Sequence, residues 1–249
     1  MAGRTLLAVL AHPDDEVLAA GTLRAQRVRG DRVVVLYLTR GEATAALGDL
    51  APEDVARRRL ELAREAAAIL DVEHRFLDFP DTGVAATPES ARTVARVLAE
   101  IAPDALITWG RMWAKGMRHP DHHATGTIAV DAVTLARIAR VAAPHAPHRA
   151  ECPVFTYRGA HSTLPSVVVD VEPHLDEVFA LADFYRTNIG FGERTWLESR
   201  LRAAGSEFGV AWGERFDAWE AAPGVVDALL PATPRDGPAH PSRPGPVNR

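Results

Sequence analysis

Residues 6–16 read Leu6-Leu7-Ala8-Val9-Leu10-Ala11-His12-Pro13-Asp14-Asp15-Glu16, an apolar run that ends abruptly in a charged turn. A short, continuous apolar run that ends in a turn is typical of a buried strand. Residues 17–29 then have apolar side chains at helical spacing, and residues 33–38 form a second apolar run. The chain therefore opens with a predicted strand, helix and strand, and the charged turn lies at the carboxyl end of the first strand.

The same alternation continues along the chain. Periodicity predicts helices at 51–70, 88–101, 122–140 and 174–186, and strands at 75–79, 105–109, 154–157 and 166–171. Strands separated by helices of this length favour a mainly parallel sheet that is covered on both faces. We expect an α/β fold, a three-layer α/β/α sandwich of Rossmann-like type, with its active site at the strand carboxyl ends.

The composition is that of a globular protein, with 249 residues, of which 47% are hydrophobic and 24% charged. We expect a single domain over residues 1–230. Residues 231–249 are rich in proline and poor in large apolar side chains, which predicts a disordered tail. Residues 192–219 carry several aromatic side chains but no motif that indicates a role.

The formal net charge of −5 gives no basic field of the kind that binds nucleic acid or anionic lipid. Cys152 is the only cysteine, which excludes an intrachain disulfide. No stretch approaches 18 uncharged apolar residues, so no membrane span is expected. We expect a cytoplasmic protein that acts on a small molecule, with no nucleic-acid or membrane partner. The sequence leaves open whether it forms a homo-oligomer.

Two motifs rich in histidine and aspartate follow predicted strands. Residues 12–16 (HPDDE) follow the first strand, and residues 119–123 (HPDHH) precede the helix predicted from residue 122. At one carboxyl edge their imidazoles and carboxylates would converge, and this donor set suits Zn²⁺ or Fe²⁺ better than Mg²⁺. Either motif alone is equally well explained by an aspartate that caps a helix. Their matching positions favour an open metal site with a spare carboxylate beside it.

With these two motifs, the chain resembles the PIG-L/LmbE-like family of N-acetylglucosaminyl deacetylases. Residues 39–43, 58–70, 79–83 and 169–171 also look like family segments. The resemblance implies three metal ligands, His12, Asp15 and His122. It implies that Asp14 is the general base, that His119 stabilises the oxyanion as an imidazolium, and that Asp121 orients the His119 ring.

The resemblance also implies contacts between the protein and a sugar. Arg58 and Asp81 match the family's sugar-binding positions, and Glu42 is a weaker candidate. For Arg58 the alternative is that it belongs to a solvated run of arginines at 57–59. The family's late helix carries a histidine where this chain has Tyr185, and this departure leaves the substrate open.

We therefore expect a zinc-dependent N-deacetylase, with ferrous iron as the alternative metal, that hydrolyses an N-acetyl amide on an amino sugar or a glycosylated small molecule. Asp14 would activate the metal-bound water. One alternative is a non-catalytic, metal-containing sugar-binding module, which would have no need of Asp14. Another is a hydrolase of a different amide, ester or phosphoester, although a two-metal phosphoesterase would require a second set of ligands.

Overall fold

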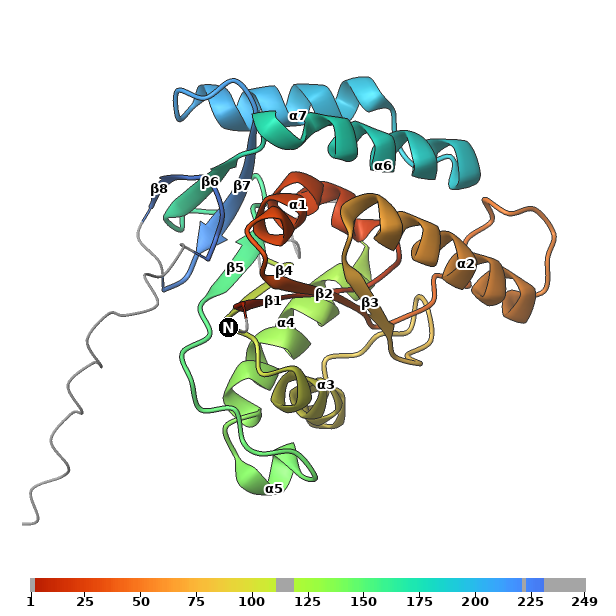
Figure 1. Cartoon of the computed structure of the whole chain (residues 1–249). Coiled ribbons are helices and arrows are strands. Elements are labelled where there is room, and N and C mark those ends of the chain that lie inside the picture. The colour runs from red at the N-terminus through yellow and green to blue at the C-terminus, as the bar shows by residue number, and fades with distance from the viewer. Residues whose placement is uncertain (1–2, 111–118, 221–222, 231–249) are drawn as a thin grey trace, which may run out of the picture.

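The computed structural model describes residues 3–110, 119–220 and 223–230 (Figure 1). Within these residues the strands form one eight-stranded sheet in the order β3-β2-β1-β4-β5-β7-β6-β8. Among them, only β7 runs antiparallel to its neighbours, so the sheet is mostly parallel, as predicted. The strands are β1 (Thr5–Leu10), β2 (Arg32–Tyr37), β3 (Glu73–Phe76), β4 (Ala105–Trp109), β5 (Val154–Tyr157), β6 (Ser166–Asp170), β7 (Gly213–Ala218) and β8 (Gly224–Val226).

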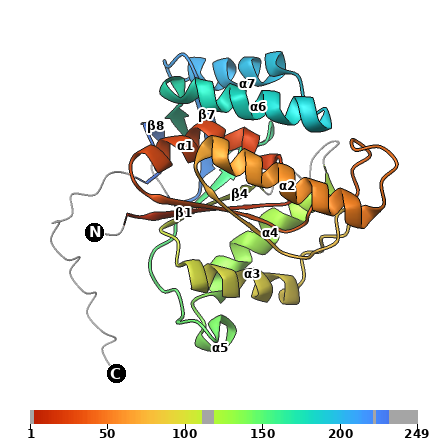
Figure 2. The same ribbon diagram turned by 45° about the vertical axis from the view of Figure 1, so that its right-hand side comes forward.

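Helices cover both faces of the sheet (Figures 1 and 2). One face carries α1 (Ala20–Val28), α2 (Pro52–Leu70), α6 (Leu175–Ile189) and α7 (Arg194–Ser206). The opposite face carries α3 (Pro88–Ile101), α4 (Pro120–Leu135) and α5 (Ala139–Ala142). This arrangement confirms the predicted three-layer α/β/α fold of Rossmann-like type.

Strand β1 lies between two hydrophobic cores. Leu6, Ala8 and Leu10 pack into the core shared with α1, α2 and α6, whereas Leu7 and Val9 pack into the core shared with α3 and α4. All five side chains are fully buried. A strand that is buried on both faces needs an apolar residue at every position, which is why the run in the sequence is continuous rather than alternating.

The order of the strands changes direction between β1 and β4. Strands β2 and β3 lie on one side of β1, and β4 and β5 lie on the other. In open parallel sheets, ligands bind in the crevice outside the carboxyl ends at such a point. Helix α4 approaches this edge closely because residue 126 is glycine: a Cβ on Gly126 would lie 2.2 Å from the carbonyl oxygen of Trp109. Both histidine motifs therefore meet at the switch point of the sheet.

Several elements differ from their predicted boundaries. The helix predicted at 17–29 begins as a tight 3-10 turn, η1 (Asp15–Ala19), because the chain must turn from strand to helix within a few residues. The strand predicted at 75–79 is β3, which starts two residues earlier, where it first pairs with β2. The helix predicted at 122–140 ends at Leu135, and the extended backbone of Ile138 separates it from α5.

Residues 192–219, for which the sequence predicted no element, contain α7 and β7. Strand β7 reads Gly213-Glu214-Arg215-Phe216-Asp217-Ala218, which has no apolar run and gave no strand signal. No described helix is both long and apolar enough to cross a membrane. The predicted disordered tail at 231–249 lies outside the described residues.

Candidate metal centre and active site

The three side chains expected to bind a metal converge at the switch point. His12 follows β1, Asp15 begins η1, and His122 lies in the first turn of α4. Nδ1 of His12 lies 3.3 Å from Nε2 of His122, and that nitrogen lies 3.1 Å from Oδ1 of Asp15. The two motifs, separated by about a hundred residues of sequence, therefore place their nitrogen and oxygen atoms at one point.

These spacings fit a zinc ion. Bonds of about 2.0 Å in tetrahedral geometry place neighbouring ligand atoms about 3.3 Å apart, close to the two distances observed. The ring of His119 is also near, and donor atoms of His12, His119 and His122 lie within 4.8 Å of one another. A second such group consists of His12, Asp81, His119 and Asp121. The cluster therefore has the donor set of a metal site, with His119 as a further nearby imidazole.

Trp109 holds two members of this cluster in place. Its ring stacks on the His122 ring, with centroids 3.7 Å apart and an angle of 6° between the planes. Its Nε1–H donates to Oδ2 of Asp15 at 3.2 Å, and the backbone N–H groups of Ala11 and His12 donate to the same oxygen. Oδ2 is thus saturated with donors, and Oδ1 is the oxygen that faces His122.

Two carboxylates orient the His12 ring from its other side. Nε2 of His12 lies 3.0 Å from Oδ1 of Asp81 and 3.2 Å from Oδ2 of Asp121. A ring that donates from Nε2 presents a lone pair at Nδ1, on the side of His122 and Asp15. Burial alone would lower the pKa of His12, but Asp81, Asp15 and Asp14 raise it to about 9. The same negative field that attracts a proton favours a divalent cation.

The contacts of Asp121 differ from those expected from the sequence. Its carboxylate contacts His12 and accepts hydrogen bonds from the backbone N–H groups of Thr82 and Val84, at 2.8 and 3.3 Å. Its contact with His119 runs through the backbone instead, because the N–H of Asp121 donates to Nδ1 of His119 at 3.3 Å. The side chain of Asp121 therefore contacts His12 directly, and its orientation of the His119 ring stays a prediction.

His119 is the N-cap residue of α4. Burial and the neighbouring His12 and His122 rings lower the pKa of His119, against the opposing charges of Asp121 and Asp81. With Nδ1 as an acceptor, a neutral His119 carries its proton on Nε2, from which it can donate. Its role as an imidazolium at the oxyanion stays a prediction.

Asp14 lies beside this cluster in an unusual backbone conformation, with φ 131° and ψ −19°. Its Oδ2 pairs with the guanidinium of Arg59 at 2.8 Å, and Arg59 also donates to the carbonyl oxygen of Pro13. Burial raises the pKa of Asp14 to about 6, although Arg59 opposes the shift. Asp14 is therefore a carboxylate beside the predicted metal ligands that is itself held by a buried cation.

Arg58 lies outside the cluster, and its contact with a sugar stays a prediction. Arg58 is half-exposed on α2 and pairs with Glu61 at 3.0 Å, whereas its neighbour Arg59 is buried and reaches Asp14. The sequence signal pointed to this turn of the helix, and in the structure Arg59 rather than Arg58 reaches the cluster. Successive residues of a helix point about 100° apart, so the run of three arginines did not show which one faces inward.

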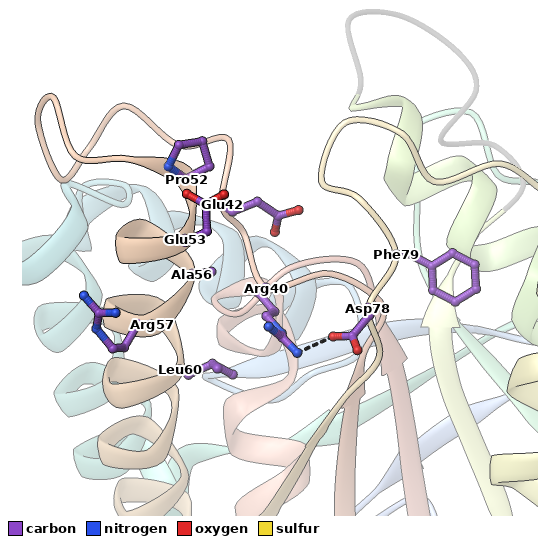
Figure 3. A pocket seen from close by; sticks show the side chains of 9 residues that line it. All are labelled: Arg40, Glu42, Pro52, Glu53, Ala56, Arg57, Leu60, Asp78 and Phe79. Atoms are coloured by element: carbon purple, nitrogen blue, oxygen red, sulfur yellow. Dashed lines mark ion pairs between the residues drawn. The ribbon is translucent and has the colours of Figure 1, made fainter.

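Glu42 contributes by holding Asp81. Its Oε1 accepts a hydrogen bond from the N–H of Asp81 at 2.8 Å, while the N–H of Ala43 donates to Oδ2 of Asp81 at 2.9 Å. Glu42 itself lines a neighbouring cavity of about 420 Å³, between α2 and the loops that follow β2 and β3 (Figure 3). In that cavity Arg40 forms an ion pair with Asp78 (Figure 3).

The cluster opens into a cavity of about 280 Å³. Its walls come from the segments that follow β1, β2, β3 and β4, together with α2, the first turn of α4 and the segment after α6. The lining residues are His12, Asp14, Asp15, Gly41, Ala43, Thr44, Arg59, Asp81, Thr82, His119, His122 and Phe191. Of the predicted site residues, Arg58, Glu42 and Asp121 lie outside this lining. Asp121 contacts two residues that belong to it, His12 and Thr82.

The fold and this cluster define an α/β protein with a metal-type histidine and aspartate site at the switch point of its sheet. The sequence model of the PIG-L family, described as GlcNAc-PI de-N-acetylase, matches residues 7–133, which contain both motifs. The chain belongs to this family.

Two curated relatives are similar to part of the chain. A 1D-myo-inositol 2-acetamido-2-deoxy-alpha-D-glucopyranoside deacetylase from Catenulispora acidiphila is 33% identical over 162 residues, covering 54% of this chain and 50% of the relative. A diacetylchitobiose deacetylase from Thermococcus kodakarensis is 31% identical over 135 residues, covering 53% and 50%. The chain thus spans about half the length of these relatives.

Solved structures share the fold over most of the chain. A conserved protein from Thermus thermophilus superposes with a TM-score of 0.73 at 31% identity, covering 86% of this chain and 93% of that one. The zinc-inhibited form of the teicoplanin deacetylase Orf2 superposes with a TM-score of 0.65 at 19% identity, covering 86% and 97%. A 4-carboxy-2-hydroxymuconate hydratase from Pseudomonas putida superposes with a TM-score of 0.72 at 21% identity, covering 91% and 100%. Deacetylases and a hydratase share this fold, so the chemistry must be argued from the site.

Proposed function

We propose that this protein is a zinc-dependent N-deacetylase that removes the acetyl group from an amino sugar or a glycosylated small molecule. The observation that carries the proposal is the position of Asp14 beside the cluster of His12, Asp15 and His122. A site that only captured a metal and a ligand would have no use for an additional carboxylate fixed by a buried arginine. Family membership and the two deacetylase relatives support the same reaction class.

His12, Asp15 and His122 would hold the metal, through Nδ1, Oδ1 and Nε2 respectively. These are the atoms that face one another, whereas the opposite sides of His12 and Asp15 are occupied by other partners. A bound zinc ion lowers the pKa of water and polarises an acyl oxygen. Iron in the ferrous state would accept the same nitrogen and oxygen donors.

Asp14 acts as the general base in this proposal. It accepts a proton from the water that attacks the acetyl carbon, while the carbon–nitrogen bond breaks and the amine nitrogen gains a proton. His119, at the rim of the same cavity, would act as an imidazolium that donates a hydrogen bond from Nε2 to the acyl oxygen or a proton to the departing amine, and would itself become a neutral imidazole. Arg59 keeps the Asp14 carboxylate aimed into the cavity.

The lining of the cavity suits a hydroxyl-bearing substrate. Asp81 and Arg59 both line the cavity, where a carboxylate can accept from sugar hydroxyls and a guanidinium can donate to them. A volume of about 280 Å³ favours one sugar ring with its acetamide in the closed part of the site. The rest of a larger substrate would extend outward.

The direct test is acetate release by the purified full chain, with zinc supplied or removed by a chelator. The substrates are N-acetylglucosamine, N,N'-diacetylchitobiose and the acetamido sugar of inositol. We expect release from at least one of them, lost on chelation and restored by zinc. Asp14→Asn should keep the metal and lose about 10²-fold to 10⁴-fold in kcat. Tight binding of one sugar without turnover would favour the binding module, and phosphoester hydrolysis would favour the other hydrolase class.

A further inference from the structure

The backbone of Asp14 requires an explanation. A φ of 131° lies in the region that side chains other than glycine rarely adopt. Such conformations persist only where surrounding contacts determine them, and they concentrate at functional sites. Asp14 is also the residue whose carboxylate must be aimed at a reacting water in the proposed reaction. The contacts that impose this conformation are therefore part of the active site.

One of these contacts comes from the neighbouring Glu16. Its Oε2 accepts a hydrogen bond from the N–H of Asp14 at 2.9 Å, which fixes the peptide plane on the amino side of Asp14. Glu16 is fully buried, so bulk solvent does not reach its carboxylate. A buried carboxylate that holds another group must itself be held.

Tyr185 holds Glu16 from a distant part of the chain. The Tyr185 hydroxyl donates to Oε1 of Glu16 at 2.5 Å, across 169 residues of sequence. Tyr185 is fully buried on α6, among the apolar residues of the core between the helices and the sheet. The hydroxyl is thus a polar group placed deep in an apolar layer, and its hydrogen bond is aimed at the carboxylate that holds Asp14.

We propose that Tyr185 and Glu16 are positioning residues for the base: Tyr185 fixes the Glu16 carboxylate, and Glu16 fixes the backbone of Asp14 in the conformation that aims its side chain into the cavity. The expected loss of kcat rests on the proposed function, whereas the expected change in the Asp14 backbone rests on the geometry alone. Neither residue lines the cavity, so both act through Asp14 rather than on the substrate. Helix α6 thereby helps to set the geometry of a turn that follows β1.

The test is Tyr185→Phe in the full chain, because phenylalanine keeps the buried ring and removes only the hydroxyl. The matched control is Ser90→Ala. Ser90 lies on α3, outside the site, and its hydroxyl donates to the carbonyl oxygen of Ala85 at 2.8 Å. We expect Tyr185→Phe to lower kcat by about tenfold to a hundredfold, as misplacement of a catalytic group by about 1 Å does, with KM and zinc content unchanged. Ser90→Ala should leave kcat unchanged.

Crystal structures of the two variants give a reading that does not depend on turnover. In Tyr185→Phe, Asp14 should leave the positive-φ conformation or occupy two conformers, while His12, Asp15 and His122 stay in place. Glu16→Gln provides a second variant, since its amide can still accept from Asp14 and contact Tyr185, and it should lose less activity than Tyr185→Phe. An unchanged Asp14 conformation in Tyr185→Phe would overturn the inference. Failure of the wild type to release acetate would instead refute the proposed function. The conformation of Asp14 in Tyr185→Phe would then decide whether Tyr185 and Glu16 position Asp14.

Discussion

Trp109 lies flat on the ring of His122 while its indole N–H reaches Oδ2 of Asp15. One side chain at the end of β4 thereby fixes two of the proposed metal ligands, which come from different motifs. Losing a residue that orients a metal ligand in this way typically lowers metal affinity by about tenfold to a hundredfold. Trp109 therefore combines packing in the core with control of the ligand geometry.

Trp109→Phe separates these two contributions. Phenylalanine can keep the stacking on His122 but loses the hydrogen bond to Asp15, so Asp15 gains rotational freedom. We expect zinc affinity to fall by about tenfold to a hundredfold, the usual effect of losing such a partner. Competition against a chromophoric chelator measures the change. An unaltered affinity in a folded variant would show that the two backbone N–H groups at Oδ2 of Asp15 are sufficient to orient it.

Arg59 and Arg58 provide a matched pair on one turn of α2. Arg59 is buried against Asp14, and removing one partner of a buried pair costs about 3–5 kcal/mol. Arg58 is half-exposed beside Glu61, where an ion pair contributes about 0–1 kcal/mol. We expect Arg59→Met to reduce the free energy of unfolding and kcat strongly, and Arg58→Met to change both little. Chemical denaturation and acetate release give the two measurements, and equal effects of the two substitutions would contradict this assignment.

The fold and the centre of the site could be predicted because their signals are local. The apolar run at 6–11 leads directly into the motif at 12–16, and the motif at 119–123 opens the helix that follows β4. The rules of parallel sheets bring the two motifs to one edge. Tyr185 could not be linked to Glu16 in this way, since 169 residues separate them and each is an ordinary residue of its own helix or turn.

Strand β7 escaped prediction for a related reason. It inserts antiparallel between β5 and β6, which are closer to each other in the sequence than either is to β7. Its residues Glu214 and Asp217 are buried polar groups whose partners lie on other elements: Glu214 accepts from the N–H groups of Gly21 and Thr22, and Asp217 pairs with Arg158. Such pairings are set by the tertiary fold and leave no periodicity in the sequence.

Zinc binding should stabilise the chain. Substitutions of Asp15 and Asp81, which both lie at the cluster, test which residues bind the ion. At a zinc concentration a hundred times the Kd, a ligand specific for the folded state adds about 2.7 kcal/mol of stability. We expect Asp15→Asn to abolish most of the zinc-induced rise in Tm, because Oδ1 of Asp15 faces His122. Asp81→Asn should retain most of it, because Asp81 contacts the opposite nitrogen of His12. Thermal unfolding with and without zinc makes the comparison, and the reverse ranking would favour the group of His12, Asp81, His119 and Asp121 as the metal site.

Glu214 should make stability depend on pH through a group that lies away from the metal site. Burial raises the pKa of Glu214 to about 7 from the ordinary 4.5, although the N–H groups of Thr22 and Gly21 and the charge of Arg200 oppose the shift. Between these two pH values the folded chain keeps the proton while the unfolded chain has lost it. Protons are then released on unfolding, so the free energy of unfolding falls as pH rises.

The size of this effect follows from the shift of Glu214. A difference of 1.36 kcal/mol for each pKa unit gives a contribution of about 3 kcal/mol, present below pH 4.5 and lost by about pH 7. Glu214→Gln removes the titration, and its amide cannot accept from both Gly21 and Thr22, so the variant should lose some stability at every pH. The informative quantity is therefore the difference in unfolding free energy between wild type and variant, measured by denaturant titration from pH 5 to 8. As pH rises, we expect the wild type to lose stability relative to the variant. Parallel curves of unfolding free energy against pH for the two proteins would show that Glu214 is ionised in the folded protein across the whole range.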